Sequence, residues 1–135
     1  MIDETVGVDQ DAVIGFATAF DPQSFHTDPV AAAEGPFGGL IASGWHTSAL
    51  MMRLFATQYL SSVASLGSPG IDELRWPAPV RPGDTLRLRA TVLDARRSRS
   101  RPDRGIVTTG AELRNQDDTP VLTLTAINLL RARQG

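Results

Sequence analysis

The chain has 135 residues, of which 41% are hydrophobic and 21% are charged, and its formal net charge is −2. This length and composition predict one globular domain over residues 1–135 with a buried core. The small negative charge gives no overall basic field, so nucleic-acid binding is not expected. The absence of cysteine excludes disulfides, thiolate catalysis and cysteine zinc sites.

The N-terminus and the least polar stretch give no targeting or membrane signal. Residues 1–4 are acidic at Asp3 and Glu4 and lack the basic-then-apolar layout of a signal peptide. Residues 42–64 are weakly polar but are interrupted by His46 and Arg53, so they do not match a membrane span. We therefore expect a cytoplasmic protein with no membrane contact.

The first third of the chain is predicted to hold a short strand, a helix and an irregular segment. Residues 4–8 could form the strand, and Asp9 or Asp11 can cap a helix that ends near Phe20. Its apolar residues recur at helical spacing: Ala12, Val13, Phe16, Ala17 and Phe20. Residues 21–42 are rich in proline and glycine, with one helical turn predicted at 28–33, capped by Asp28 and begun by Pro29. Such long irregular segments are often functional.

Residues 43–65 form the clearest predicted helix. Ser43 is a candidate cap, Arg53 is the one charged residue, and apolar side chains lie on nearly every side. A helix that is apolar all round is typically a buried helix. At ~1.5 Å per residue it would be roughly 30 Å long, about the width of a small domain.

The remaining residues predict strands. These are expected at 71–76, 86–92, 106–114 and 121–130, with turns at 81–84 and 115–118 and a charged connection over 96–105. Successive strands joined by short turns are usually antiparallel. The order predicts an α+β architecture in which an antiparallel sheet wraps the long helix.

The first candidate site is the pair Asp21 and His26, five residues apart in a proline-containing segment. A carboxylate and an imidazole that share a water can act as general base and general acid. The alternative is that Asp21 caps a turn and His26 is a packed loop residue, and this segment alone favours that alternative.

The second candidate site is the glycine-rich segment 37–46, which leads into the long helix. The first N–H groups of a helix have no internal partner, and the helix dipole adds partial positive charge there. Gly44 could therefore bind an oxygen that gains negative charge. Tight packing is the alternative reason for a glycine, and it is the stronger interpretation for Gly38 and Gly39 than for Gly44.

Taken together these motifs resemble the MaoC dehydratase family. The resemblance lies in Phe20-Asp21-Pro22-Gln23-Ser24-Phe25-His26-Thr27-Asp28-Pro29, then Ile41-Ala42-Ser43-Gly44, then Val80-Arg81-Pro82-Gly83-Asp84. It covers residues 5–130 and implies a hot-dog fold with a sheet wrapped around a central helix. It also implies that Asp21 and His26 are the catalytic pair and that the Gly44 N–H, with Ser43 and Gln23 nearby, binds substrate. The family's Asn-Pro between the catalytic residues is here Gln23-Ser24.

The resemblance implies hydration of trans-2-enoyl thioesters to (R)-3-hydroxyacyl thioesters, or the reverse. The substrate would be an acyl-CoA or a thioester on acyl carrier protein, with no metal and no organic cofactor, and the protein would be a homodimer or a larger homo-oligomer. The depth of the pocket would depend on a set of large side chains: Trp45, Met51, Met52, Phe55 and Trp76.

Two other functions stay open on the sequence. A hot-dog thioesterase often has an acid on its central helix, and residues 43–65 contain neither Asp nor Glu. A non-catalytic subunit that binds acyl thioesters would not need the Asp21/His26 pair. Two further features have weaker interpretations: His46 could face the site, and five arginines could bind coenzyme A phosphates. These are Arg96, Arg97, Arg99, Arg101 and Arg104.

Overall fold

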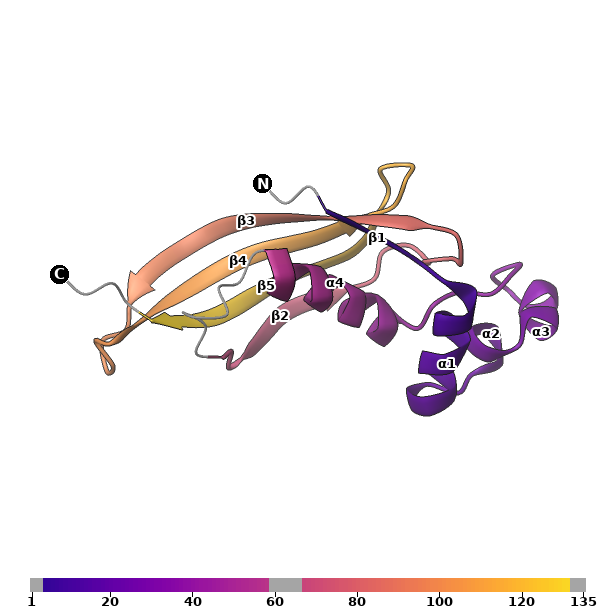
Figure 1. Cartoon of the computed structure of the whole chain (residues 1–135), viewed down its shortest axis with the longest axis horizontal. Helices are drawn as coiled ribbons and strands as arrows, with labels where there is room; N and C mark the ends of the chain where they lie inside the picture. The colour runs from indigo at the N-terminus through magenta and orange to yellow at the C-terminus, as the bar shows by residue number, and fades with distance from the viewer. Residues whose placement is uncertain (1–3, 59–66, 132–135) are drawn as a thin grey trace.

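The computed structural model describes residues 4–58 and 67–131. Its elements in chain order are β1 (Thr5–Gly7), α1 (Gln10–Phe20), α2 (Ser24–Thr27), α3 (Pro29–Glu34), α4 (Gly44–Gln58), β2 (Gly70–Arg75), β3 (Thr85–Arg97), β4 (Arg104–Arg114) and β5 (Pro120–Arg131). Helix α4 runs along one face of the long strands, and α1, α2 and α3 gather beyond one end of the sheet (Figure 1).

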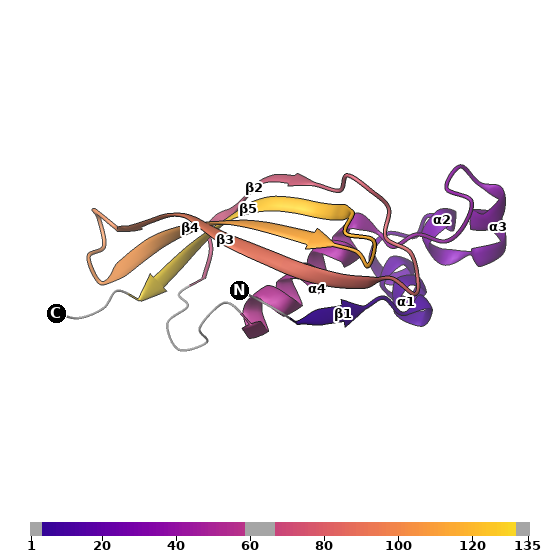
Figure 2. The ribbon, with the colours of Figure 1, turned by 90° about the horizontal axis from the view of Figure 1, so that it is seen from above.

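The five strands form one antiparallel sheet in the order β1-β3-β4-β5-β2. Leu88 pairs with Leu113 of β4, which pairs with Leu122 of β5, so an apolar row crosses three strands. This sheet with α4 on one side (Figure 2) confirms the predicted α+β architecture. The predicted alternation over 86–92 stops before Val92, which is exposed although it pairs in register with Thr109. The register of β3 shifts after this residue, between Val92 and Asp94.

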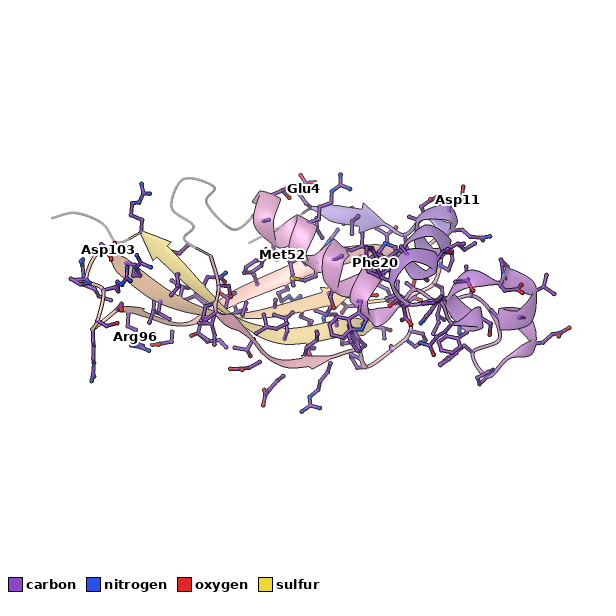
Figure 3. The ribbon with its side chains drawn as sticks, turned by 90° about the horizontal axis from the view of Figure 1, so that it is seen from below. Glu4, Asp11, Phe20, Met52, Arg96 and Asp103 are labelled. Atoms are coloured by element: carbon purple, nitrogen blue, oxygen red, sulfur yellow. The ribbon has the colours of Figure 1, made fainter. Side chains whose placement is uncertain are left out.

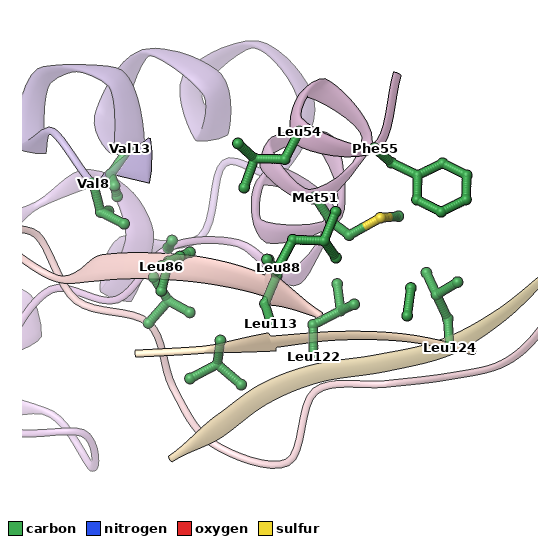
Figure 4. Packing of buried hydrophobic residues seen from close by; sticks show 14 of the residues in the cluster. Val8, Val13, Met51, Leu54, Phe55, Leu86, Leu88, Leu113, Leu122 and Leu124 are labelled. Atoms are coloured by element: carbon green, nitrogen blue, oxygen red, sulfur yellow. The ribbon is translucent and has the colours of Figure 1, made fainter. Parts of the chain in front are cut away.

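The core lies between α4 and the inner face of the sheet (Figure 4). Met51, Leu54 and Phe55 of α4 pack on leucines of β3, β4 and β5 that are almost completely buried: Leu86, Leu88, Leu113 and Leu122. Each such side chain contributes about 1.5–3 kcal/mol when it is fully removed from water. The first turn of α4 is thereby fixed relative to the sheet, and this turn is where the candidate site lies.

Helix α4 is buried on one face only, which corrects the prediction of a helix buried all round. Trp45 is 58% exposed and Met52 is 45% exposed, whereas Met51 and Phe55 are buried. The composition shows that the helix is apolar, but an apolar side chain stays exposed in one chain when no other element covers it. The predicted end of this helix near Ser65 lies outside the described residues, and the extent of the domain over 1–135 stays a prediction.

Local capping signals are confirmed. The Asp9 carboxylate accepts a hydrogen bond from the Ala12 N–H, and the Asp28 carboxylate accepts two, from the N–H groups of Val30 and Ala31. The Trp45 N–H donates to Ser43 Oγ at 3.2 Å, as expected of a residue that caps α4. Helix α2 was not predicted, since four residues give no periodic pattern.

The charged connection expected over 96–105 is shorter in the structure. Strand β3 continues to Arg97 and β4 begins at Arg104, with Arg96 paired to Ile106 and Arg97 to Gly105. Backbone pairing carries both strands through the arginines because their side chains can extend into solvent. Within residues 4–58 and 67–131, no helix is long and apolar enough to cross a membrane.

Candidate active site

His26 is held by α2 in a buried and fixed orientation. Its side chain is 6% exposed, and its Nδ1 lies 2.8 Å from the carbonyl oxygen of Ile41. A carbonyl only accepts hydrogen bonds, so Nδ1 carries the proton in this contact and Nε2 is the nitrogen left for chemistry. The Ile41 N–H donates back to the Phe25 carbonyl at 3.0 Å, which ties α2 to the segment before α4.

Asp21 ends α1 and receives hydrogen bonds on both carboxylate oxygens. The Gln23 Nε2–H donates to Oδ1 at 2.6 Å, and the Ser43 hydroxyl donates to Oδ2 at 2.7 Å. The hydrogen bonds from Gln23 and Ser43, in that order, and the charge of His26 lower the pKa of Asp21, although desolvation opposes them. The lowered pKa keeps the carboxylate ionised at neutral pH. Its side chain is 19% exposed, so it is still open to a small ligand.

The structure brings the two predicted catalytic side chains together. His26 Nε2 lies 3.3 Å from Asp21 Oδ2, the oxygen that also accepts from Ser43. An ionised carboxylate can take a proton from a bound molecule, and an imidazole that carries a proton on Nε2 can give one back. Gln23 and Ser43, predicted beside the substrate, both contact the Asp21 carboxylate and fix its orientation.

Gly44 begins α4, and its backbone N–H donates to no acceptor within the described part of the chain. A cavity of about 340 Å³ lies against this first turn, a volume within the roughly 300–1,000 Å³ of ligand pockets. Both His26 and Gly44 line it, so an imidazole and a free helix N–H open onto one space. The other lining residues are Phe37, Ile41, Ala42, Thr47, Trp76, Pro77, Ala78, Pro79, Val80 and Val121.

The glycines of this region behave differently from the expectation. A Cβ on Gly44 would lie 2.5 Å from two indole carbons of Trp76, so Gly44 is the tightly packed glycine. Gly38 has open space around it and a φ of +65°, a conformation that glycine adopts at little cost. A Cβ on Gly39 would lie 3.3 Å from the Arg81 guanidinium, so Gly39 is closely packed, as expected. The packing of Gly44 was missed because Trp76 is distant in sequence.

Residues 77–80 are a part of the cavity wall that the sequence did not place in the site. The Ala42 N–H donates to the Val80 carbonyl at 2.8 Å, which holds this segment beside the start of α4. Among the large side chains expected to set pocket depth, Trp76 lines the cavity. Met51 and Phe55 are in the core, and Trp45 and Met52 are exposed.

The arginine-rich hairpin lies far from the candidate site. Figure 3 places Arg96 and Asp103 at one end of the molecule, well away from Phe20, the residue before Asp21. Arg104 forms an ion pair with Asp103, at 3.2 Å, in this hairpin. These arginines therefore do not reach the cavity of their own chain. No group of three or more His, Asp or Glu side chains that could bind a metal occurs in the described ranges 4–58 and 67–131.

His46 lies in α4 but points away from the cavity into a packed environment. Its ring stacks on Phe16 of α1 with centroids 4.9 Å apart, and its buried Nδ1 has no hydrogen-bond partner in the described structure. Burial lowers the pKa of His46, because the charged form is poorly solvated there. His46 therefore has a structural place between α1 and α4.

This burial predicts an acid sensitivity of folding. Unfolded His46 takes up a proton near pH 6.5, whereas the folded protein resists protonation, so stability falls as the pH drops below about 6.5. We expect the urea midpoint of the wild type to fall more between pH 8 and pH 5 than that of His46→Leu. The contribution from Asp21 is lost only below about pH 4 and does not interfere. An equal fall in both proteins would contradict this assignment.

The comparisons with known proteins identify a family and a fold for this chain. A family model described as MaoC like domain matches residues 2–115. The crystal structure of the MaoC-like dehydratase from Rhodospirillum rubrum superposes with a TM-score of 0.88 and 44% identity, covering 98% of this chain and 90% of that one. YdeM of Bacillus subtilis is 30% identical over 118 residues, which are 87% of this chain and 82% of YdeM.

A further relative has a named activity. The 3-hydroxyacyl-thioester dehydratase Z of Mycobacterium tuberculosis is 39% identical over 90 residues, which are 65% of this chain and 60% of that protein. The match therefore spans less than two thirds of that relative's length. Over most of its length, however, the chain matches the family model and the Rhodospirillum rubrum structure. The chain therefore belongs to the MaoC-like domain family and has the hot-dog fold of its structural relatives.

Proposed function

We propose that the chain hydrates trans-2-enoyl thioesters to (R)-3-hydroxyacyl thioesters and catalyses the reverse dehydration. The observation that carries this proposal is the pairing of the Asp21 carboxylate with His26 Nε2, 3.3 Å apart, beside a cavity that also meets the start of α4. The similarity to a 3-hydroxyacyl-thioester dehydratase supports the same reaction class. The thioester would be carried by coenzyme A or by acyl carrier protein.

The pair would activate one water molecule. Asp21 begins as the ionised partner, because its pKa is lowered, and it takes a proton as the water oxygen bonds to C3 of the enoyl group. His26 carries a proton on Nε2 when it is ion-paired with Asp21, and it gives this proton to C2. The double bond is thereby lost, and the proton on Asp21 returns to His26 across the short gap between them.

The start of α4 would stabilise the charge that develops on the substrate. As oxygen adds to C3, electrons move from the double bond toward the thioester oxygen. The free N–H of Gly44, at the positive end of the helix dipole, can donate to that oxygen. One such donor is worth about 3 kcal/mol of barrier. We propose that no metal or organic cofactor takes part, because the thioester itself accepts these electrons.

We also propose that the chain works as a homodimer. The outer face of α4 carries the exposed side chains of Trp45 and Met52, and the edge strand β2 exposes Ile71. Apolar groups gathered on one helix and one sheet edge favour contact with a protein surface. A sedimentation measurement that gave a monomer at micromolar concentration would contradict this.

The proposed reaction is tested by the loss of enoyl absorbance with crotonyl-CoA and with a longer trans-2-enoyl-CoA. The wild type is expected to form the (R)-3-hydroxyacyl product, and His26→Ala is expected to lose turnover by about a hundredfold or more. His46→Leu removes the other histidine, which lies away from the cavity, and should retain activity. A folded wild type that turned over neither thioester would contradict the proposal, as would full activity in His26→Ala.

A further inference from the structure

Trp76 forms one wall of the cavity and at the same time reaches the surface. It follows directly after β2, it lines the cavity, and its side chain is 40% exposed. Pro77 and Pro79 come next in the chain, and each fixes its own φ, so the backbone beside the indole has little freedom. The indole therefore separates the cavity from solvent at this point.

The contacts of Trp76 hold the indole against the first turn of α4. The distance of 2.5 Å from a Cβ built on Gly44 shows that the ring rests directly on that glycine. The indole Nε1–H donates to Ser48 Oγ at 3.2 Å, and the Ser48 hydroxyl donates to the Gly44 carbonyl at 2.9 Å. The ring of Trp45 lies edge-on to the indole, with centroids 5.1 Å apart.

We propose that Trp76 is the wall that limits the length of the acyl chain, so that the cavity favours short-chain acyl thioesters over longer ones. This rests on the proposed function, which places the thioester oxygen at the Gly44 N–H. The indole then stands next to the bound carbonyl, and an acyl chain in the cavity meets it. The cavity of about 340 Å³ must hold the thioester group and the water at His26 as well as the acyl chain, so a longer chain is the first to press against the indole.

The binding of saturated thioesters tests this limit without turnover. Calorimetry with butanoyl-CoA and octanoyl-CoA is expected to show at least about tenfold tighter binding of butanoyl-CoA by the wild type. Trp76→Leu opens the wall, and each methylene that is then buried adds about fourfold in affinity, so the preference should disappear or reverse. Val92→Ala shortens an exposed side chain that does not line the cavity and should keep the wild-type ratio.

A second variant keeps the test valid if Trp76→Leu folds poorly. Ser48→Ala leaves the indole in place but removes its hydrogen bond, so the preference for butanoyl-CoA should weaken while the far-ultraviolet circular dichroism is unchanged. Equal binding of the two thioesters by the wild type would overturn the proposal. So would an unchanged ratio in both variants, or a shift in Val92→Ala as large as that in Trp76→Leu.

The outcomes also separate this proposal from the proposed function. Selective binding of butanoyl-CoA without hydration of any enoyl thioester would contradict the proposed reaction and support the role of Trp76 in limiting chain length. Hydration of short and long enoyl thioesters with equal kcat/KM, and the same equality in Trp76→Leu, would support the proposed reaction. It would contradict the role of Trp76 in limiting chain length.

Discussion

Asp21→Asn is expected to lower kcat for hydration of crotonyl-CoA by about a thousandfold, with little change in KM. Asparagine keeps the size of the side chain, but its amide cannot take a proton from water. General acid–base catalysis typically contributes 10²–10⁴-fold, which sets the expected size of the loss. Steady-state kinetics measure both constants, and calorimetry with butanoyl-CoA checks that ligand binding is retained. A kcat within tenfold of the wild type would contradict the role of Asp21 as the base.

Ser43→Ala is the graded control for this prediction. It removes one of the two hydrogen bonds to the Asp21 carboxylate and leaves the bond from Gln23 in place. The pKa of Asp21 should rise toward its usual value, because the charged form loses a donor. Since a base must be deprotonated to act, the acid limb of the kcat profile should move to higher pH. We expect kcat at neutral pH to fall less in Ser43→Ala than in Asp21→Asn. This smaller fall, together with the shifted acid limb, would show that Ser43 positions Asp21 and that Asp21 itself transfers the proton.

The sequence predicted those features that depend on neighbours along the chain. The caps Asp9, Asp28 and Ser43 each act within three residues, so their residue types and spacing were sufficient. The alternation of Leu86 and Leu88 with arginines identified the buried face of β3. Helix α4 was placed correctly at its start, because the cap at Ser43 marks that position.

Features that depend on contacts between distant residues could not be predicted in this way. The Ser43 hydroxyl joins Asp21, and the Ile41 carbonyl fixes the Nδ1 proton of His26. Neither bond has a local pattern. The exposure of Trp45 could not be foreseen either, because periodicity shows which side chains share a face but not whether another element covers it. The motif resemblance selected Asp21 and His26 as the expected catalytic pair, and the hydrogen bonds between distant residues explain how the two side chains are held together.

Gly44→Ala is expected to lower kcat/KM by about a hundredfold while stability changes little. The new Cβ would lie 2.5 Å from the Trp76 indole, so the ring must swing away and its bond to Ser48 must break. A displacement of about 1 Å near the reacting atoms can cost about a hundredfold in rate. Alanine is the better helix former by up to about 1 kcal/mol, which offsets part of the lost packing. Kinetics and urea unfolding of the same variant measure the two effects separately.

The double variant Gly44→Ala/Trp76→Leu shows why a glycine is needed at this position. With the indole removed, the new methyl group has room, and part of the lost kcat/KM should return relative to the sum of the two single losses. A partial return of kcat/KM would mean that a glycine is needed here to leave room for Trp76. The contact between Gly44 and Trp76 would then fix both the indole that limits the acyl chain and the N–H that donates to the thioester oxygen. Strictly additive losses would mean instead that the substrate oxygen itself needs the open approach to the Gly44 backbone, and the indole would then be incidental to the reaction.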